Sequence, residues 1–209
     1  MMEEQTSWRI GAIALPVTLI AVAAGFLLWM MTGAQGYRAA DWADTDGQCY
    51  YRNLLTRQAF AVDVDWNGED GVVIVIPNEV HGYQVTALGG YSGRGVPTAF
   101  ALNAPETWDI RVRFGDAESA ADAETDYPNA KIVDCAMTLK LGKNVKKLNE
   151  VSCFGFYGYD ENGVETVWRL RWHVECDEEN ESFYAKDGRL YSREDGKSAE
   201  AFRYREQGL

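Results

Sequence analysis

Three acidic or amide side chains in one short segment have the types and spacing of a calcium-binding loop. Asp63, Asp65 and Asn67, followed by Gly68, match the first six positions of an EF-hand loop. The twelfth position, which should supply a bidentate glutamate, is Ile74, within an apolar run. We therefore expect no metal site here, and we interpret Asn67-Gly68 as a hairpin turn.

Neither histidine stands in a sequence typical of nucleophilic catalysis. His81 lies in the turn sequence HGY, and His173 begins an apolar strand pattern, so no serine or cysteine context for catalysis is visible. Residues 89–95 (GGYSGRG) lack the Lys-Ser/Thr ending of a phosphate-binding loop. We therefore predict that the protein is not an enzyme and has no catalytic residue, cofactor or bound metal.

The four cysteines leave two interpretations open. Their spacing contains no Cys-x-x-Cys and fits no zinc pattern. In an exported domain they could form two disulfides, with three possible connectivities. They could equally be small buried apolar side chains. The cysteines are Cys49, Cys135, Cys153 and Cys176.

Aromatic residues are abundant, with seven Trp, eleven Tyr and eight Phe, and many lie between positions 154 and 172. Most should fill the core of a folded domain. Because aromatic side chains are also enriched at binding surfaces, some are candidates for contact with a protein or a sugar. The candidate ligand surface consists of Tyr157, Tyr159, Trp168 and Trp172.

The net charge of −12 argues against nucleic acid and anionic lipid as partners. Residues 1–40 carry two acidic and two basic side chains, so the whole negative balance falls in residues 41–209.

Residues 10–31 form an uncharged apolar segment long enough to cross a bilayer as a helix. Trp8 and Trp29 lie near its ends, where interfacial tryptophan is expected. The sequence predicts a transmembrane helix or signal anchor here. The alternative is a cleaved signal peptide, with residues 34–36 as the cleavage site.

Several short strands look like copies of one unit. The sequence VIVIPNEV (73–80) aligns with TLKLGKNV (138–145) and with HVECDEEN (173–180), and RVRFGDAE (111–118) is a weaker copy. The equivalent inward positions are Ile76, Leu141, Cys176 and, in the weaker copy, Phe114. VTALGG (85–90) aligns with VKKLNE (145–150). Recurrence at this spacing predicts stacked repeats, each burying its apolar face against a neighbour.

These units resemble the BspA-like leucine-rich repeats of bacterial surface proteins. The motifs that carry the resemblance are IVIPNEV, GYQVTALGG and LKLGKNVKKLNEV, and ENESFYAKDGRLYSREDGK matches a hairpin segment of the same family. VDWNGEDGVVIVIP is similar to the family's opening hairpin. The resemblance covers roughly residues 60–93 and 137–198, and it implies a solenoid whose work is binding.

Two Asp-Gly turns near the end of the chain, at Gly188 and Gly196, predict a three-stranded meander that caps the solenoid. Phe183, Leu190, Tyr191 and Phe202 would face the stack. The acidic residues 116–126 are expected to form a solvated loop.

The predicted fold is mainly β: a short leucine-rich-repeat-type solenoid with a terminal β-meander, preceded by one N-terminal transmembrane helix. The domain limits are a tail at 1–9, the anchor at 10–31, a linker at 32–48 and the repeat domain at 49–209. The predicted function is non-catalytic binding of a protein or surface polymer, outside the cytoplasm, by a membrane-anchored bacterial domain. The alternatives are a carbohydrate-binding module and a structural subunit of a membrane assembly.

Overall fold

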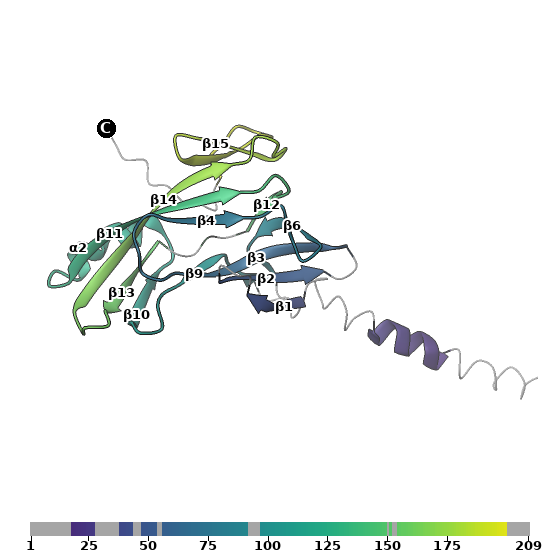
Figure 1. Cartoon of the computed structure of the whole chain (residues 1–209), viewed down its shortest axis with the longest axis horizontal. Coiled ribbons are helices and arrows are strands. Elements are labelled where there is room, and N and C mark those ends of the chain that lie inside the picture. Colours follow the sequence, from purple (N-terminus) through teal and green to yellow (C-terminus); the bar gives the residue numbers. More distant parts are fainter. Residues whose placement is uncertain are drawn as a thin grey trace, which may run out of the picture.

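The computed structural model describes residues 18–27, 38–43, 47–53, 56–91, 97–149, 151 and 154–199. Two β-sheets contain most of the strand residues that the structure describes (Figure 1). The first sheet runs in the order β1 (Arg38–Ala43), β2 (Gln48–Asn53), β3 (Gln58–Asp65), β6 (Tyr83–Leu88) and β12 (Lys147–Leu148), with β5 (Glu79–Val80) beside β6 and β9 (Ala101–Asn103) beside β3. The second runs in the order β10 (Asp109–Phe114), β13 (Gly155–Tyr159), β14 (Glu165–Cys176), β11 (Lys131–Leu141) and β4 (Val72–Ile76).

Two small hairpins complete the strands, formed by β7 (Gly90–Tyr91) with β8 (Pro97–Thr98) and by β15 (Phe183–Lys186) with β16 (Arg189–Ser192). The mainly β character predicted from the sequence is confirmed. The sheet begins earlier than predicted, since β1 lies within the residues expected to form a linker.

The repeat alignment is confirmed for three strands. In the second sheet β4, β11 and β14 run parallel, and Leu141 pairs with Ile76 on one side and with Cys176 on the other. In the first sheet Leu88 of β6 pairs with Leu148 of β12, which is also the predicted register. Ile76 and Leu141 are buried, so the three repeats do stack their apolar faces.

The predicted solenoid is nevertheless wrong, because the parallel stack ends after three strands. On its other edge β14 pairs with β13 in antiparallel fashion, and β13 in turn pairs antiparallel with β10. The proposed weaker repeat around Phe114 is therefore wrong as well, since β10 does not join the parallel stack. The predicted opening hairpin is also not formed, because β3 and β4 belong to different sheets.

The core lies between the two sheets and contains a stack of aromatic rings. The Trp108 ring lies 4.0 Å from the Trp168 ring and 5.4 Å from the Trp66 ring, and Trp66 stacks on Phe156 at 5.9 Å. A side chain at Gly68 would meet the Trp108 ring at 2.6 Å, so a glycine is required where this turn crosses the ring. Gly68 also has a φ of +86°, which favours glycine.

The acidic stretch predicted as a loop is instead a helix, α2 (Ala117–Asp126). Asp116 caps it by accepting a hydrogen bond from the Ser119 amide at 2.8 Å. Ala120 and Ala123 are buried against Phe114 and Phe154, so the small residues between the acids supply the packing face. The acids themselves point mostly to solvent, which is why the segment looked like a loop.

The closing hairpin covers β14 at one end of the stack, as predicted (Figure 1). Leu190 is fully buried, Phe183 packs against the same core, and Gly188 and Gly196 have positive φ angles. Tyr191 stacks on Tyr184 rather than on the core, and Phe202 lies outside the described residues. The third strand of the meander is reduced to one bridge, between Tyr191 and Ser198.

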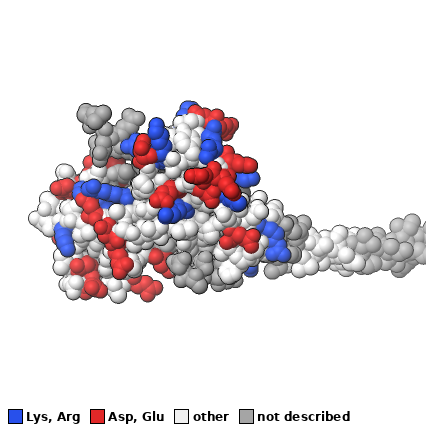
Figure 2. All heavy atoms as spheres, turned by 45° about the horizontal axis from the view of Figure 1, so that its top comes forward, with Lys and Arg blue, Asp and Glu red and all other residues white. Residues whose placement is uncertain are grey.

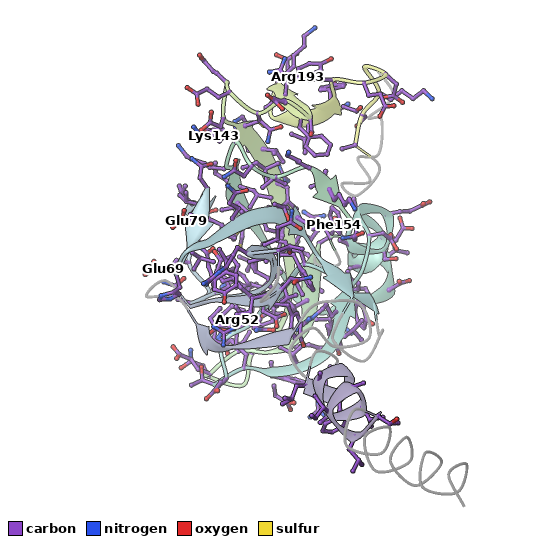
Figure 3. The ribbon with its side chains drawn as sticks, turned by 90° about the vertical axis from the view of Figure 1, so that its right-hand side faces the viewer. Arg52, Glu69, Glu79, Lys143, Phe154 and Arg193 are labelled. Atoms are coloured by element: carbon purple, nitrogen blue, oxygen red, sulfur yellow. The ribbon has the colours of Figure 1, made fainter. Side chains whose placement is uncertain are left out.

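Asn180 ends the parallel stack where the first two repeats carry Val80 and Val145. Its side-chain amide donates to the Gly142 carbonyl at 2.9 Å and to the Val145 carbonyl at 3.0 Å. Its side-chain oxygen accepts from the amides of Ser182 and Phe183 at 2.9 and 2.8 Å. The buried side chain thus ties the second repeat to the start of the hairpin. Arg193, labelled in Figure 3, adds a bond to the Asn180 carbonyl at 2.8 Å.

The described helix nearest the N-terminus covers residues 18–27 and lies apart from the sheets (Figure 1). Among the residues that the structure describes, no helix is both long and apolar enough to cross a membrane. In the described part of that segment, residues 18–27, the predicted transmembrane helix is therefore not found. Residues 10–17 and 28–31 of that segment lie outside the described residues.

Replacing Asn180 with Ala should destabilise the fold by about 2–4 kcal/mol, because two buried carbonyls lose their donor and two amides lose their acceptor. Urea denaturation followed by fluorescence measures this change. The control is Asn162→Ala, at an exposed residue of the loop between β13 and β14. Equal midpoints for both variants would contradict the closing role given to Asn180.

Candidate functional site

A hollow of about 480 Å³ lies between α2, β14 and the turn that joins β15 to β16. Its charged lining comes from Asp134 of β11, Arg169 and Arg171 of β14, and Asp187 and Arg189 of the turn. Its apolar lining comes from residues on α2, before β13 and on β14. These are Ala117, Ala120, Ala121, Phe154, Leu170 and Trp172. In Figure 3 Phe154 lies beside α2.

The charged side of the hollow follows from the two-residue period of β14. Successive side chains of a strand point to opposite faces, so Arg169, Arg171 and His173 share one face. Leu170 and Val174 face the core instead and are buried. The turn carrying Gly188 closes over this face, because a side chain at Gly188 would meet the His173 ring at 2.4 Å.

Asp134 organises the two arginines of β14. Arg169 is its direct neighbour across the parallel pair, and the guanidinium forms two hydrogen bonds to the carboxylate, at 2.8 and 2.9 Å. Arg169 also reaches Glu124 of α2 at 3.3 Å. Arg171 contacts the second oxygen of the same Asp134 at 2.9 Å. One carboxylate is therefore shared by two guanidinium groups.

This sharing sets the protonation of the pair. Burial alone raises the pKa of Asp134, but the hydrogen bonds and positive charge of Arg169 and Arg171 outweigh it and leave the pKa below its ordinary value. The hydrogen bonds from Arg169 to Asp134 likewise raise the pKa of that guanidinium. Asp134 is thus held ionised, and it fixes Arg169 in place.

The hollow occupies a gap along one edge of β14. β13 pairs with this edge as far as Arg169, and the Leu170 amide then donates to the Phe154 carbonyl at 2.9 Å. Farther along, the Val174 amide donates to the Gly188 carbonyl at 2.8 Å. The hairpin therefore contacts this edge of β14 beyond the end of the β13 pairing. Half-buried Trp172 lies between the contacts at Leu170 and Val174.

The four aromatic residues predicted as a ligand surface do not form one. Trp168 is only 4% exposed and belongs to the aromatic stack of the core. Tyr157 stacks on Tyr127 at 3.7 Å and donates a hydrogen bond to Glu165 at 2.6 Å, which together with burial raises its pKa to about 12. Tyr159 is half-buried on β13. Trp172 alone lines the hollow.

The cysteines within the described residues are free thiols. Cys135 is buried, and Cys49 and Cys176 are half-buried. Burial raises the pKa of the Cys135 and Cys176 thiols to about 11, so both are protonated at neutral pH. Cys153 lies outside the described residues. For the other three, the structure agrees with the interpretation as small buried side chains.

In the calcium-like segment Asp63 and Asp65 lie on strand β3, and Asn103 donates a hydrogen bond to Asp65 at 3.2 Å. Within the described ranges no group of three or more His, Cys, Asp or Glu side chains could hold a metal ion.

Sequence reasoning missed the residues that do come together. These are Asp134 on one strand and Arg169 and Arg171 on the next. In both strands charged and apolar residues alternate, and charged residues in such a pattern usually form a solvated face. The available signal was that Asp134 and Arg169 precede the aligned positions Leu141 and Cys176 by the same seven residues. That spacing places them opposite each other once the strands are parallel.

Comparison with known proteins gives no match for this chain among protein-family models, curated proteins or solved structures. The resemblance to BspA-like repeats therefore rests on the motifs quoted above, and the site must be interpreted from its geometry.

Replacing Asp134 with Asn should lower stability at neutral pH by about 1 kcal/mol, the upper range for a partly exposed ion pair. Because the folded-state pKa of Asp134 lies below the unfolded value, its contribution is present above about pH 4 and disappears as the pH falls through the folded-state pKa. Thermal melts from pH 2.5 to 7 should therefore converge in acid. The control is Asp126→Asn at the exposed end of α2, and a constant offset at every pH would refute the role of Asp134.

Proposed function

We propose that this chain is a non-catalytic binding domain, and that it binds a surface polymer by taking one unit of the polymer into the hollow beside β14. The observation that carries the proposal is the hollow itself, which five separated parts of the chain build from charged and apolar side chains. Small-molecule pockets are about 300–1,000 Å³ in volume, so the hollow of about 480 Å³ suits one small unit of a polymer.

The charge distribution supports one localised site rather than a broad binding face. In Figure 2 acidic and basic side chains are interspersed over the visible face. Several of the outward lysines are paired, as Lys140 is with Glu175 at 2.9 Å and Lys143 with Glu179 at 2.8 Å. A ligand therefore meets a mixed surface, and the hollow is where apolar area and a fixed arginine pair occur together.

Filling the hollow tests this proposal without disturbing the core. Ala121 is exposed on α2 and lines the hollow, so Ala121→Trp should place an indole in the space that the ligand needs. We expect full-length wild type to bind members of an array of bacterial surface glycans, and Ala121→Trp to lose at least tenfold in affinity.

The matched control is Thr125→Trp, which adds the same ring at an exposed position of α2 outside the hollow. Its melting temperature and binding should both equal those of the wild type. Equal binding by both tryptophan variants would place the site elsewhere. Binding to a peptide array alone would replace the polymer with a protein ligand.

We also propose that the domain is attached to a membrane and faces away from the cytoplasm. The support is the apolar sequence of residues 10–31, together with a resemblance to surface proteins.

Most of the full-length protein should therefore stay with the membrane fraction after a carbonate wash. Deleting residues 10–31 should release the protein, whereas deleting residues 1–9 should not. Added protease should cut residues 41–209 in intact cells. Soluble wild-type protein, or protection of those residues, would overturn this localisation.

A further inference from the structure

We infer that the unit bound in the hollow is an acidic sugar, and that its carboxylate is held by Arg171. This inference rests on the proposed function, since it names the chemistry of the ligand of that same hollow. It depends on three features of the described lining: its charge balance, the donors of Arg171, and the way the edge of β14 is closed.

The hollow has a small positive balance within a strongly acidic protein. Its described lining contains three arginines and two aspartates, whereas the whole chain carries a net charge of −12. The lining therefore carries more basic than acidic side chains although the whole chain is acidic, and Glu124 lies outside the lining against Arg169.

Arg169 is already committed to the protein and does not supply the charge that binds a ligand. Its guanidinium forms two hydrogen bonds with Asp134 and a third contact with Glu124. Its side chain is 23% exposed. Arg169 therefore acts as a positioning residue that holds Asp134 beside Arg171.

Arg171 has more N–H donors than its contact with Asp134 uses. Its side chain is 70% exposed, and in the described part of the chain its acidic partner is the single Asp134 oxygen at 2.9 Å. A guanidinium has five N–H donors in a planar fork, which matches a carboxylate in bidentate geometry. Asp134 is shared between Arg171 and Arg169, and Arg169 has Glu124 as a further acidic partner, whereas Arg171 has only its share of Asp134 among the described residues. A ligand carboxylate would supply Arg171 with a second acidic partner.

The edge of β14 favours a compact ring over an extended peptide. A peptide adding to this edge would need its backbone donors and acceptors. The amides of Leu170 and Val174 already donate to Phe154 and Gly188. The other edge of β14 pairs with β11 from Thr166 to Cys176. The ligand therefore contacts side chains, with Trp172 and the alanine face of α2 as the apolar wall against which a sugar ring can pack.

Paired oligosaccharides test the inference directly. The probes are a panel of uronic-acid-containing oligosaccharides, each matched with its carboxyl-reduced, neutral form. Isothermal titration calorimetry with the full-length protein should show at least tenfold tighter binding of one or more acidic members than of their neutral forms. Raising the salt from 50 to 500 mM should weaken that binding, since the charge on Arg171 is exposed.

One arginine variant and one lysine variant test where the ligand carboxylate binds. Arg171→Gln should reduce affinity for the acidic form about tenfold and leave affinity for the neutral form unchanged. Lys140→Gln removes the same charge from the neighbouring strand, outside the hollow, and should change neither. Thermal melts of both variants confirm that the fold is retained.

Several results would overturn the inference. If acidic and neutral forms bound equally and Ala121→Trp abolished both, the hollow would still be the binding site but the carboxylate would have no role. A sulfated oligosaccharide binding as tightly as the acidic one would show a general anion site instead. Binding of glutamate-rich peptides but of no uronic acid would replace the sugar with a peptide. An Arg171→Gln variant with wild-type affinity would move the carboxylate away from Arg171.

Discussion

The structure depends on one strand, β11, being paired on both of its edges from Met137 to Leu141. Met137, Leu139 and Leu141 on its inner face are almost completely buried, and a strand in that position cannot leave backbone groups unpaired. β4 supplies the partner on one side and β14 on the other, both in parallel. Because the side-chain period of a strand is two, this double pairing fixes which residues of all three strands face the core and which face out.

The outer face of the same ladder creates the charged part of the hollow. The register that aligns Leu141 with Cys176 also aligns Asp134 with Arg169, seven residues earlier on each strand. Farther along, it aligns Lys140 with Glu175, which form an ion pair. Opposite charges on directly paired residues stabilise a parallel ladder modestly. Their larger effect here is to hold Arg169 and to leave Arg171 exposed.

The sequence predicted these local relations well and the global path of the chain poorly. Ile76, Leu141 and Cys176 could be aligned because each ends a strand followed by a similar turn, and the turn at Gly188 was visible as Asp-Gly. The long pairing of β14 with β13 was not visible, because Gly155–Tyr159 looks like an aromatic core segment with no repeat. α2 was missed because its acidic residues indicated a solvated loop, although Ala120 and Ala123 alone make the buried face. Trp168 was misjudged for a related reason. Only the tertiary stack with Trp108 shows whether such a ring is buried.

The hollow exists because the repeats stop. In a continuing stack the edge of β14 would be covered by another parallel strand, and Arg171 would be one more outward residue on a regular sheet. Here the third repeat carries Asn180 in place of the valine of the first two, and this buried amide turns the chain into a hairpin instead. The first backbone hydrogen bond from this edge of β14 to the hairpin is at Val174, whereas β13 pairs with β14 only as far as Arg169 and Phe154 accepts from the Leu170 amide. The gap between them, walled by α2, is therefore a direct consequence of how the stack is closed. Asn180, which closes the stack, lies between β14 and β15, so it follows the strand that carries Arg171.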